Sequence, residues 1–139
     1  MVRHARETDV DRVLEIETLS FPNPWTRYYL ENALSDFFLV YDDGAVRGYL
    51  AATCKEKDRK ATILKVAVHP EARGRGVASA LVQGALDQFR EKGIRNVDLD
   101  VKIISSGAVK LYEKFGFRIQ RMVTINSDDT SFYIMQKDL

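Results

Sequence analysis

Residues 61–92, ATILKVAVHPEARGRGVASALVQGALDQFREK, decide how the rest of the chain is organised. The apolar run from Ile63 to Val68 is typical of a buried strand. A turn rich in glycine and arginine follows, and the apolar residues after it recur at the spacing of a helix with one buried face. The turn consists of Arg73, Gly74, Arg75, Gly76, Val77 and Ala78. This order predicts a site for an anion, because the first N–H groups of a helix have no internal partners.

The glycines and arginines of this turn favour the anion site over a plain connection. Gly74 and Gly76 permit positive φ and let a ligand approach the backbone, and the arginines add positive charge. The alternative is an ordinary strand-to-helix turn with two solvated arginines. A Walker loop is excluded, since the chain has no Gly-Lys-Ser/Thr triplet. The dinucleotide fingerprint begins well at Gly74 but has Ser79 at its last position, where glycine or alanine is typical.

The bulk properties describe an ordinary globular protein. The 139 residues, 45% hydrophobic and 29% charged, fit one domain over residues 1–139. A net charge of +1 gives no overall field to attract nucleic acid. Nothing resembles a signal peptide or a membrane span, and the single cysteine, Cys54, cannot form an internal disulfide, so we expect a cytoplasmic protein without membrane contact. No Cys/His cluster has zinc spacing, and no metal is expected.

The chain before this stretch is predicted to contain a strand, two helices and a hairpin. Residues 2–6 form a candidate strand, and Thr8 with Asp11 resembles a capping box that starts a helix. The apolar positions of this helix are Val10, Val13, Leu14, Ile16 and Leu19. Two prolines end it, and Thr26 is the expected N-cap of a second helix. The predicted hairpin has strands at residues 37–41 and 47–54, a turn at Asp42-Asp43-Gly44 and a candidate bulge at Gly48.

The segment that ends the first helix, Phe21-Pro22-Asn23-Pro24-Trp25, has two interpretations. Structurally, it is a rigid corner whose two aromatic side chains fill the core. Functionally, it is one wall of a substrate groove, because binding residues often lie on stiff loops. The two interpretations are compatible, and the pattern alone does not choose between them.

The chain after the turn completes a mixed α/β fold. Strands at 61–69 and 96–101 flank a helix that Gly93 is expected to end, and such a βαβ unit places its strands in parallel. Ser105 or Ser106 is the N-cap of a further helix that ends at Gly116. The last predicted elements are strands at 117–124 and 132–135 around a polar turn, Asn126-Ser127-Asp128-Asp129.

The segment VAVHPEARGRGVASALV resembles the R-x-x-G-x-G/A signature of the GNAT superfamily of N-acetyltransferases, which Arg73, Gly76 and Ala78 satisfy. The order of elements is also similar to the GNAT fold over essentially the whole chain. That resemblance implies a mixed sheet of about seven strands with helices on both faces. It further implies that the amides of residues 73–78 hold the pyrophosphate of acetyl-CoA, the cosubstrate. The preceding strand, through Val66 and Val68, would then bond the pantetheine arm and supply an oxyanion donor near Val68.

Acetyl transfer from a thioester needs a neutral amine, an oxyanion donor and an acid for the leaving thiolate. The segment SSGAVKLYEKFGF is similar to the family block S-x-x-A-x-x-L-Y-x-x-x-G-F, whose tyrosine usually points at the sulfur. This resemblance makes Tyr112 the candidate acid; the alternative is a core tyrosine with a satisfied hydroxyl. Ser105 falls where the family often has an asparagine that contacts the cofactor.

The resemblance also extends to the substrate side. ETLSFPNPWT is similar to the segment that lines the peptide site in protein N-terminal acetyltransferases of the ribosomal-protein-alanine type and their relatives, which implies that Phe21, Pro22 and Trp25 contact substrate. Tyr133 falls where these relatives have a tyrosine that bonds the peptide backbone; the alternative is strand packing. Asp100 falls where they carry a glutamate, and it is the candidate base. It either acts through water, binds the substrate ammonium, or is simply solvated.

The leading hypothesis is therefore acetylation of a protein or peptide N-terminus, including that of a ribosomal protein. A free α-amine has a pKa near ~8 and lysine near ~10, so the α-amine needs less help from a base. Two alternatives remain: acetylation of a small amine or a lysine, and an acyl-CoA-binding module without turnover. Cys54 is discounted as a nucleophile, because direct transfer needs no acetyl-enzyme and no histidine is its neighbour in the sequence.

Overall fold

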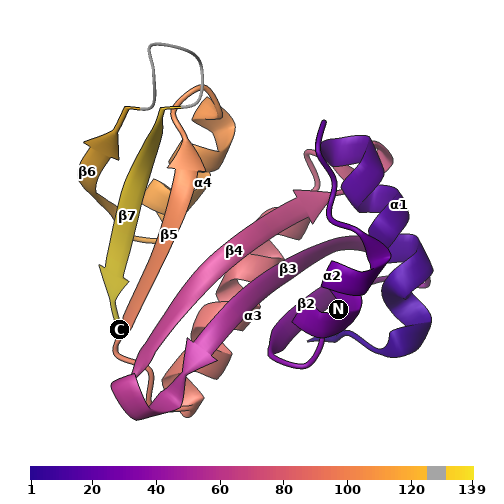
Figure 1. Ribbon diagram of the computed structural model, residues 1–139, viewed down its shortest axis with the longest axis horizontal. Helices are drawn as coiled ribbons and strands as arrows, with labels where there is room; N and C mark the ends of the chain where they lie inside the picture. Colours follow the sequence, from indigo (N-terminus) through magenta and orange to yellow (C-terminus); the bar gives the residue numbers. More distant parts are fainter. Residues whose placement is uncertain (125–130) are drawn as a thin grey trace.

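The computed structural model describes residues 1–124 and 131–139. Four α-helices and seven strands alternate along these residues (Figure 1). The helices are α1 (Val10–Ser20), α2 (Arg27–Ala33), α3 (Val77–Glu91) and α4 (Ser106–Lys114). The strands are β1 (Val2–His4), β2 (Phe37–Asp42), β3 (Val46–Lys55), β4 (Lys60–Val68), β5 (Asn96–Lys102), β6 (Arg118–Val123) and β7 (Phe132–Asp138). The predicted turn at Asn126–Asp129 lies outside the described residues.

The seven strands form one mixed sheet in the order β1-β2-β3-β4-β5-β7-β6. Strands β4 and β5 are parallel, as the βαβ pattern predicted, and the other neighbours are antiparallel. The parallel ladder joins only Lys60–Ile63 to Asn96–Leu99. Beyond it the two strands diverge, so that β5, β7 and β6 swing away from β4 (Figure 1). The sheet therefore opens at the end of β4, just where the glycine-rich turn follows.

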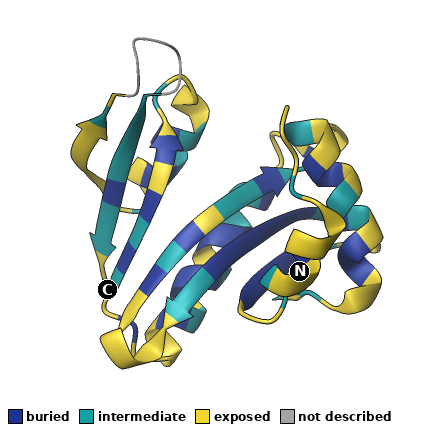
Figure 2. Ribbon diagram, viewed as in Figure 1, coloured by how far each residue is buried: buried dark blue, intermediate teal, exposed yellow. Residues whose placement is uncertain are grey.

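Helices cover both faces of the sheet and bury two apolar clusters. One cluster lies under α3 and α4 and includes Leu81, Leu86, Phe89 and Val109. The other lies under α1 and α2 and includes Val13, Ile16 and Leu30. Strands β2 and β3 are buried between the two clusters, whereas β6, at the edge of the sheet, is exposed along almost its whole length (Figure 2). The predicted mixed fold with helices on both faces is confirmed.

Most of the predicted helix ends are confirmed, and one is wrong. The Thr26 hydroxyl accepts a hydrogen bond from Tyr29 N at 3.2 Å, and Gly93 and Gly116 follow α3 and α4 with φ of +79° and +90°. Thr8, however, does not cap α1. A 3-10 turn at Glu7–Asp9 precedes that helix, and the Asp9 carboxylate accepts from Arg6 N at 2.7 Å. The side chain of Asp9 thus fixes the entry to α1 from one residue further along than predicted.

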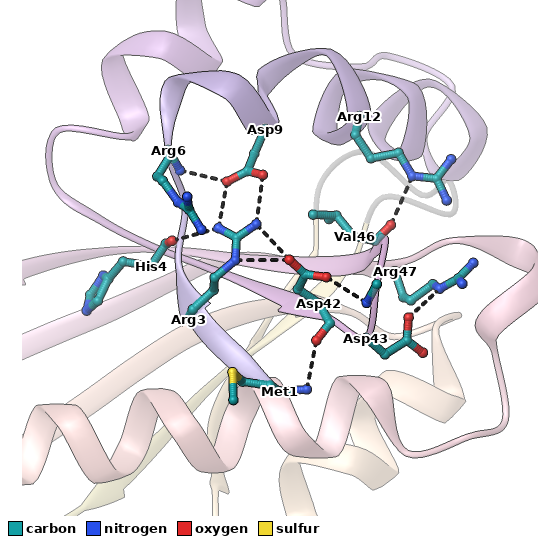
Figure 3. Close-up of polar contacts among 11 residues, drawn as sticks. Met1, Arg3, His4, Arg6, Asp9, Arg12, Asp42, Asp43, Val46 and Arg47 are labelled. Carbon is teal, nitrogen blue, oxygen red and sulfur yellow. Dashed lines mark hydrogen bonds and ion pairs between the residues drawn. The ribbon is translucent and has the colours of Figure 1, made fainter.

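The Asp9 carboxylate belongs to an ion-pair cluster that ties the N-terminus to the β2–β3 hairpin (Figure 3). The Arg3 guanidinium pairs with Asp9 at 2.8 Å and with Asp42 at 3.0 Å. Its hydrogen bonds are the main reason that the pKa of Asp9 lies below the usual value. The other Asp42 oxygen accepts from Gly44 N at 2.9 Å, which sets the predicted hairpin turn.

Gly48 is required by close packing and lies beside a bulge. The β2–β3 register shifts between Tyr41 and Asp42, which face Gly48 and Val46 and leave Arg47 as the extra residue. A Cβ at Gly48 would lie 2.8 Å from the Ala67 carbonyl oxygen and 2.9 Å from a Val77 methyl carbon. Since Val77 is the first residue of α3, Gly48 lets the start of this helix sit directly on the sheet.

Candidate active site

A cavity of about 870 Å³ lies where β4 and β5 diverge. Its walls come from the end of β4, the turn and first residues of α3, the start and middle of α4, and the end of α1. Nine of the residues predicted to form the site line it: Phe21, Val66, Val68, Arg73, Gly74, Gly76, Val77, Ala78 and Ser105. Tyr112 lines it as well. Residues up to 92 positions apart in the sequence thus line one cavity, and the turn predicted to bind a phosphate is among them.

The turn before α3 presents bare backbone to this cavity. Gly74 and Gly76 have φ of +78° and +80°, a region that glycine adopts without strain, and no atom lies within 4 Å of where their Cβ would be. Gly76 is the N-cap residue and offers no side chain to the first N–H groups of α3. Arg73 Nε donates to the Val68 carbonyl at 3.1 Å, which joins the turn to the end of β4. Arg75 is exposed and does not line the cavity.

The backbone of β4 forms the second part of this wall. The β3–β4 register shift leaves Leu64 without an opposite residue, and the pairing with β5 stops at Ile63. His69 N donates to Arg47 O at 2.8 Å, and Gly48 lies opposite Val68. In an antiparallel ladder hydrogen-bonded and non-bonded pairs alternate, so the N–H groups of Val66 and Val68 point away from β3. They face the opening between β4 and β5, where a ligand can accept their hydrogen bonds.

Tyr112 faces this backbone wall from α4. Its side chain is only 7% exposed, and its ring lies edge-on to Phe117, with ring centres 5.7 Å apart. Burial raises the pKa of Tyr112 to about 12, so its hydroxyl holds its proton at neutral pH. Among the described residues no hydrogen-bond partner of this hydroxyl is found, and the group lines the cavity. A protonated hydroxyl on a largely buried side chain, with no partner among the described residues, is what a proton donor in this cavity would need.

The profile of the Acetyltransferase (GNAT) family matches residues 10–117, which include the β4 wall, the turn and Tyr112. The protein belongs to this family. A Bacillus subtilis protein, provisionally named a ribosomal protein bS18-alanine N-acetyltransferase, is 35% identical over 122 residues, covering 84% of this chain and 80% of that protein.

Two archaeal proteins extend this similarity to almost the whole chain. An N-alpha-acetyltransferase of Sulfurisphaera tokodaii is 28% identical over 154 aligned positions, covering 99% of this chain and 92% of that protein. The solved structure of Ard1 from Thermoplasma volcanium superposes with a TM-score of 0.90 at 28% identity, covering 100% of this chain and 97% of that one. The chain is therefore similar in sequence, over almost its whole length, to a protein named N-alpha-acetyltransferase, and it shares its fold with Ard1.

The proline-rich loop between α1 and α2 places only one of its predicted residues in the cavity of this GNAT protein. Phe21 lines it, Pro22 is exposed, and Trp25 is half-buried beside it, stacked against Tyr29 with ring centres 4.7 Å apart. The Lys65 ammonium lies 4.0 Å from the Phe21 ring centre and 4.4 Å from that of Trp25. The structural interpretation of the loop is confirmed, since Phe21 and Trp25 pack on the core cluster under α1. The functional interpretation stays a prediction, which the place of Phe21 in the cavity lining supports.

Two further predicted site residues, on β5 and β7, also lie outside the cavity lining. Asp100 is exposed on β5, on the opposite face from Leu99 and Val101, which belong to the core under α3 and α4. Tyr133 is half-buried, pairs with Val101 and packs against that same core. The structure therefore separates these two residues on opposite faces of the sheet. Cys54 is half-buried on β3, and burial raises the pKa of its thiol to about 11, which disfavours the thiolate.

The sequence prediction missed Glu17, a fully buried carboxylate beside the cavity wall. It accepts hydrogen bonds from Lys65 Nζ at 2.6 Å, from Trp25 N at 2.7 Å and from the Tyr49 hydroxyl. One signal could have revealed it: Glu17 follows Val10 by seven positions and Val13 by four, so it falls on the apolar stripe of its helix. A charge on such a stripe is buried and needs partners.

Proposed function

We propose that this GNAT protein transfers the acetyl group of acetyl-CoA to the N-terminal α-amine of a protein or peptide, a ribosomal protein included, as one domain over residues 1–139. The observation that carries the proposal is a single cavity that joins a phosphate-type turn, a free strand edge and a buried tyrosine. The names of the Bacillus and Sulfurisphaera relatives support a protein α-amine as acceptor. Composition supports a cytoplasmic location for the reaction.

The residues of the turn fit the pyrophosphate of acetyl-CoA. The N–H groups at the start of α3 are uncapped by any side chain, and the open space beside Gly74 and Gly76 lets phosphate oxygens reach them. A side chain at either glycine would fill that space. Ser105, at the start of α4, borders the same hollow from across the gap. Acetyl-CoA supplies the activated acyl group when it is bound.

The edge of β4 fits the pantetheine arm. Val66 and Val68 direct backbone N–H groups into the opening between β4 and β5, and a chain of amides such as pantetheine bonds to a strand edge as another strand would. The same amides are suited to hold the thioester carbonyl and to stabilise negative charge on its oxygen. In this proposal the thioester lies between β4 and α4.

Tyr112 is the proposed general acid. Its hydroxyl gives its proton to the departing sulfur, and its raised pKa means that the proton is present to be given at neutral pH. Asp100, exposed and anionic on the other face of β5, is proposed to attract the substrate ammonium rather than to contact the reacting carbon. An α-amine loses its own proton near pH ~8, so a distant carboxylate is sufficient help.

The proposed function is tested by offering acetyl-CoA with matched peptides. One peptide has a free N-terminus, a second has the N-terminus blocked but keeps an internal lysine, and aspartate and spermidine serve as small amines. Mass spectrometry should find one added acetyl group on the free α-amine and none on the blocked peptide. Equal rates on the blocked peptide, or preference for a small amine, would replace this proposal by the corresponding acetyltransferase. Binding of acetyl-CoA without turnover of any amine would indicate a non-catalytic module.

A further inference from the structure

Glu17 joins three elements at the wall of the cavity. Its carboxylate, in the last turn of α1, is 0% exposed and accepts bonds from Trp25 N in the loop, Lys65 Nζ on β4 and the Tyr49 hydroxyl on β3. A carboxylate so far from water is costly unless several donors compensate it, and here three do. Tyr49 is equally buried, so this contact is part of the core rather than of the surface.

The same residue holds both ends of the proline-rich loop. Phe21 N donates to the Glu17 carbonyl at 3.1 Å, and Trp25 N donates to the Glu17 carboxylate at 2.7 Å. Lys65, held by that carboxylate, packs under both aromatic rings. The loop between these two residues contains only Pro22, Asn23 and Pro24, all exposed. Its position beside the cavity therefore depends on Glu17 and on the cation that Glu17 holds.

We propose that Glu17 is a positioning residue for the acceptor: through Trp25 N and Lys65 it fixes Phe21 and Trp25 as a rigid wall for the peptide. The inference rests on the proposed function, since it assigns this wall to the peptide rather than to acetyl-CoA. Of the two aromatics, Phe21 lines the cavity on the side of β4, next to Val66 and Val68. Loss of the anchor should therefore weaken the use of peptide while leaving the turn before α3 untouched.

The chain offers a matched control just before the same helix. Asp9, just before α1, is also a buried carboxylate with an arginine partner and a backbone N–H partner. It is tied to Arg3 and, through Arg3, to the hairpin (Figure 3). It does not line the cavity. Glu17→Gln and Asp9→Asn each remove one charge and keep the shape of the side chain. A general loss of stability affects both variants, whereas loss of the loop anchor affects only the first.

Steady-state kinetics and fluorescence together test the inference. In Glu17→Gln we expect the KM for a free-N-terminus peptide to rise about tenfold, because misplaced positioning groups have effects of this size or larger. The KM for acetyl-CoA should stay within about twofold, and Asp9→Asn should change neither. Trp25 is the one tryptophan of the chain, so its emission reports the loop directly. We expect a red shift in Glu17→Gln and none in Asp9→Asn.

Several outcomes would overturn the inference. An unchanged peptide KM in folded Glu17→Gln would do so, as would a rise of the same size in Asp9→Asn. If the wild type acetylates no peptide, the proposed function fails, and the emission of Trp25 alone decides whether Glu17 anchors the loop. If circular dichroism shows Glu17→Gln to be unfolded, the double variant E17Q/K65Q replaces it, because it leaves no buried charge without its partner. The same expectations then apply to the double variant.

Discussion

The two walls of the cavity are built from different materials. The wall formed by β4 and the turn before α3 presents backbone: the N–H groups of Val66 and Val68 and the glycines at 74 and 76. The wall formed by α4 presents a side chain, Tyr112, which is largely buried and whose hydroxyl lines the cavity. A backbone wall depends on local geometry and tolerates many side chains, whereas a side-chain wall depends on one functional group. In the function proposed above, this difference separates binding of acetyl-CoA from the chemical step, and each is expected to change alone.

Tyr112→Phe should produce the largest effect, because it removes the functional group of the α4 wall and leaves the backbone wall intact. We expect kcat to fall about 100-fold, the lower range for loss of a general acid. The hydroxyl has no partner among the described residues, so the thermal midpoint and the KM for acetyl-CoA should be nearly unchanged. Steady-state kinetics measures kcat and the KM for acetyl-CoA, and thermal unfolding measures the midpoint.

Tyr41→Phe is the matched control for that variant. Tyr41 is half-buried on β2 and does not line the cavity. Its substitution should leave kcat within about twofold of wild type. A Tyr112→Phe enzyme with wild-type kcat would remove the side-chain wall from the mechanism and assign proton transfer to solvent.

The pH dependence should sharpen the same comparison. The rate at low peptide concentration should rise about tenfold from pH 7 to pH 9, as an α-amine with a pKa near ~8 loses its proton. Burial raises the pKa of Tyr112 to about 12, so the acid remains protonated and its loss should lower the rate only as pH climbs toward that value.

The stability of the folded protein should also fall at high pH. Unfolded tyrosine titrates near ~10, so the folded state loses stability relative to the unfolded state as pH rises from there toward the folded pKa.

Binding of acetyl-CoA to a backbone wall should be constant between pH 7 and pH 9, which isothermal calorimetry can measure. A decline in rate below pH 9 would contradict the assignment of Tyr112.

Gly76→Ala should disturb the backbone wall alone. Alanine at φ of +80° is strained by about 1 kcal/mol, and relief of that strain moves the N–H groups that would meet the pyrophosphate. We expect the KM for acetyl-CoA to rise about fivefold while kcat remains close to wild type. Steady-state kinetics at saturating peptide measures both.

Gly93→Ala is the control at the other end of α3. Gly93 has almost the same φ, +79°, and the same open surroundings, so the strain is matched but the cavity is distant. Equal changes in KM for the two variants would show that strain in α3, rather than contact with the cosubstrate, is responsible.

Much of the difference between the backbone wall and the α4 wall could be predicted from the sequence, because local sequence patterns specify it. Glycine and arginine directly after an apolar strand predict the turn, and the pattern around Tyr112 predicts its helix. The divergence of β4 from β5 has no local pattern, since it follows from how many residues pair across strands far apart in the chain. The start of α1 was mispredicted for a similar reason. Asp9, rather than Thr8, fixes this start, because its partner Arg3 is held in place by Asp42 of the distant hairpin.

Glu17 shows the same limit within the site. Its partners, at positions 25, 49 and 65, come from a loop and two strands, so no spacing in the sequence predicts them. Asp100 and Tyr133 were predicted from motif positions alone, and the structure places them on opposite faces of the sheet. Sequence patterns therefore located the backbone wall well and the substrate side less well.

The helices in the described part of the chain include none with the length and apolar character of a membrane span.

Ser105→Ala should have the smallest effect. Ser105 lines the cavity but makes no side-chain cap to α4, so its contribution would come through the backbone. We expect less than about a twofold change in the KM for acetyl-CoA and in kcat. A loss of tenfold or more in binding would show that the α4 wall also binds the cosubstrate through a side chain, which would blur the division between the two walls.

Amide hydrogen exchange with and without coenzyme A tests the central claim most directly. If the backbone wall grips the cosubstrate, coenzyme A should slow exchange at residues 66–68 and 74–79 and leave the hairpin turn at 42–46 unchanged. Protection confined to the hairpin or to the second cavity between Arg6 and α2, or no protection at residues 74–79, would contradict the account.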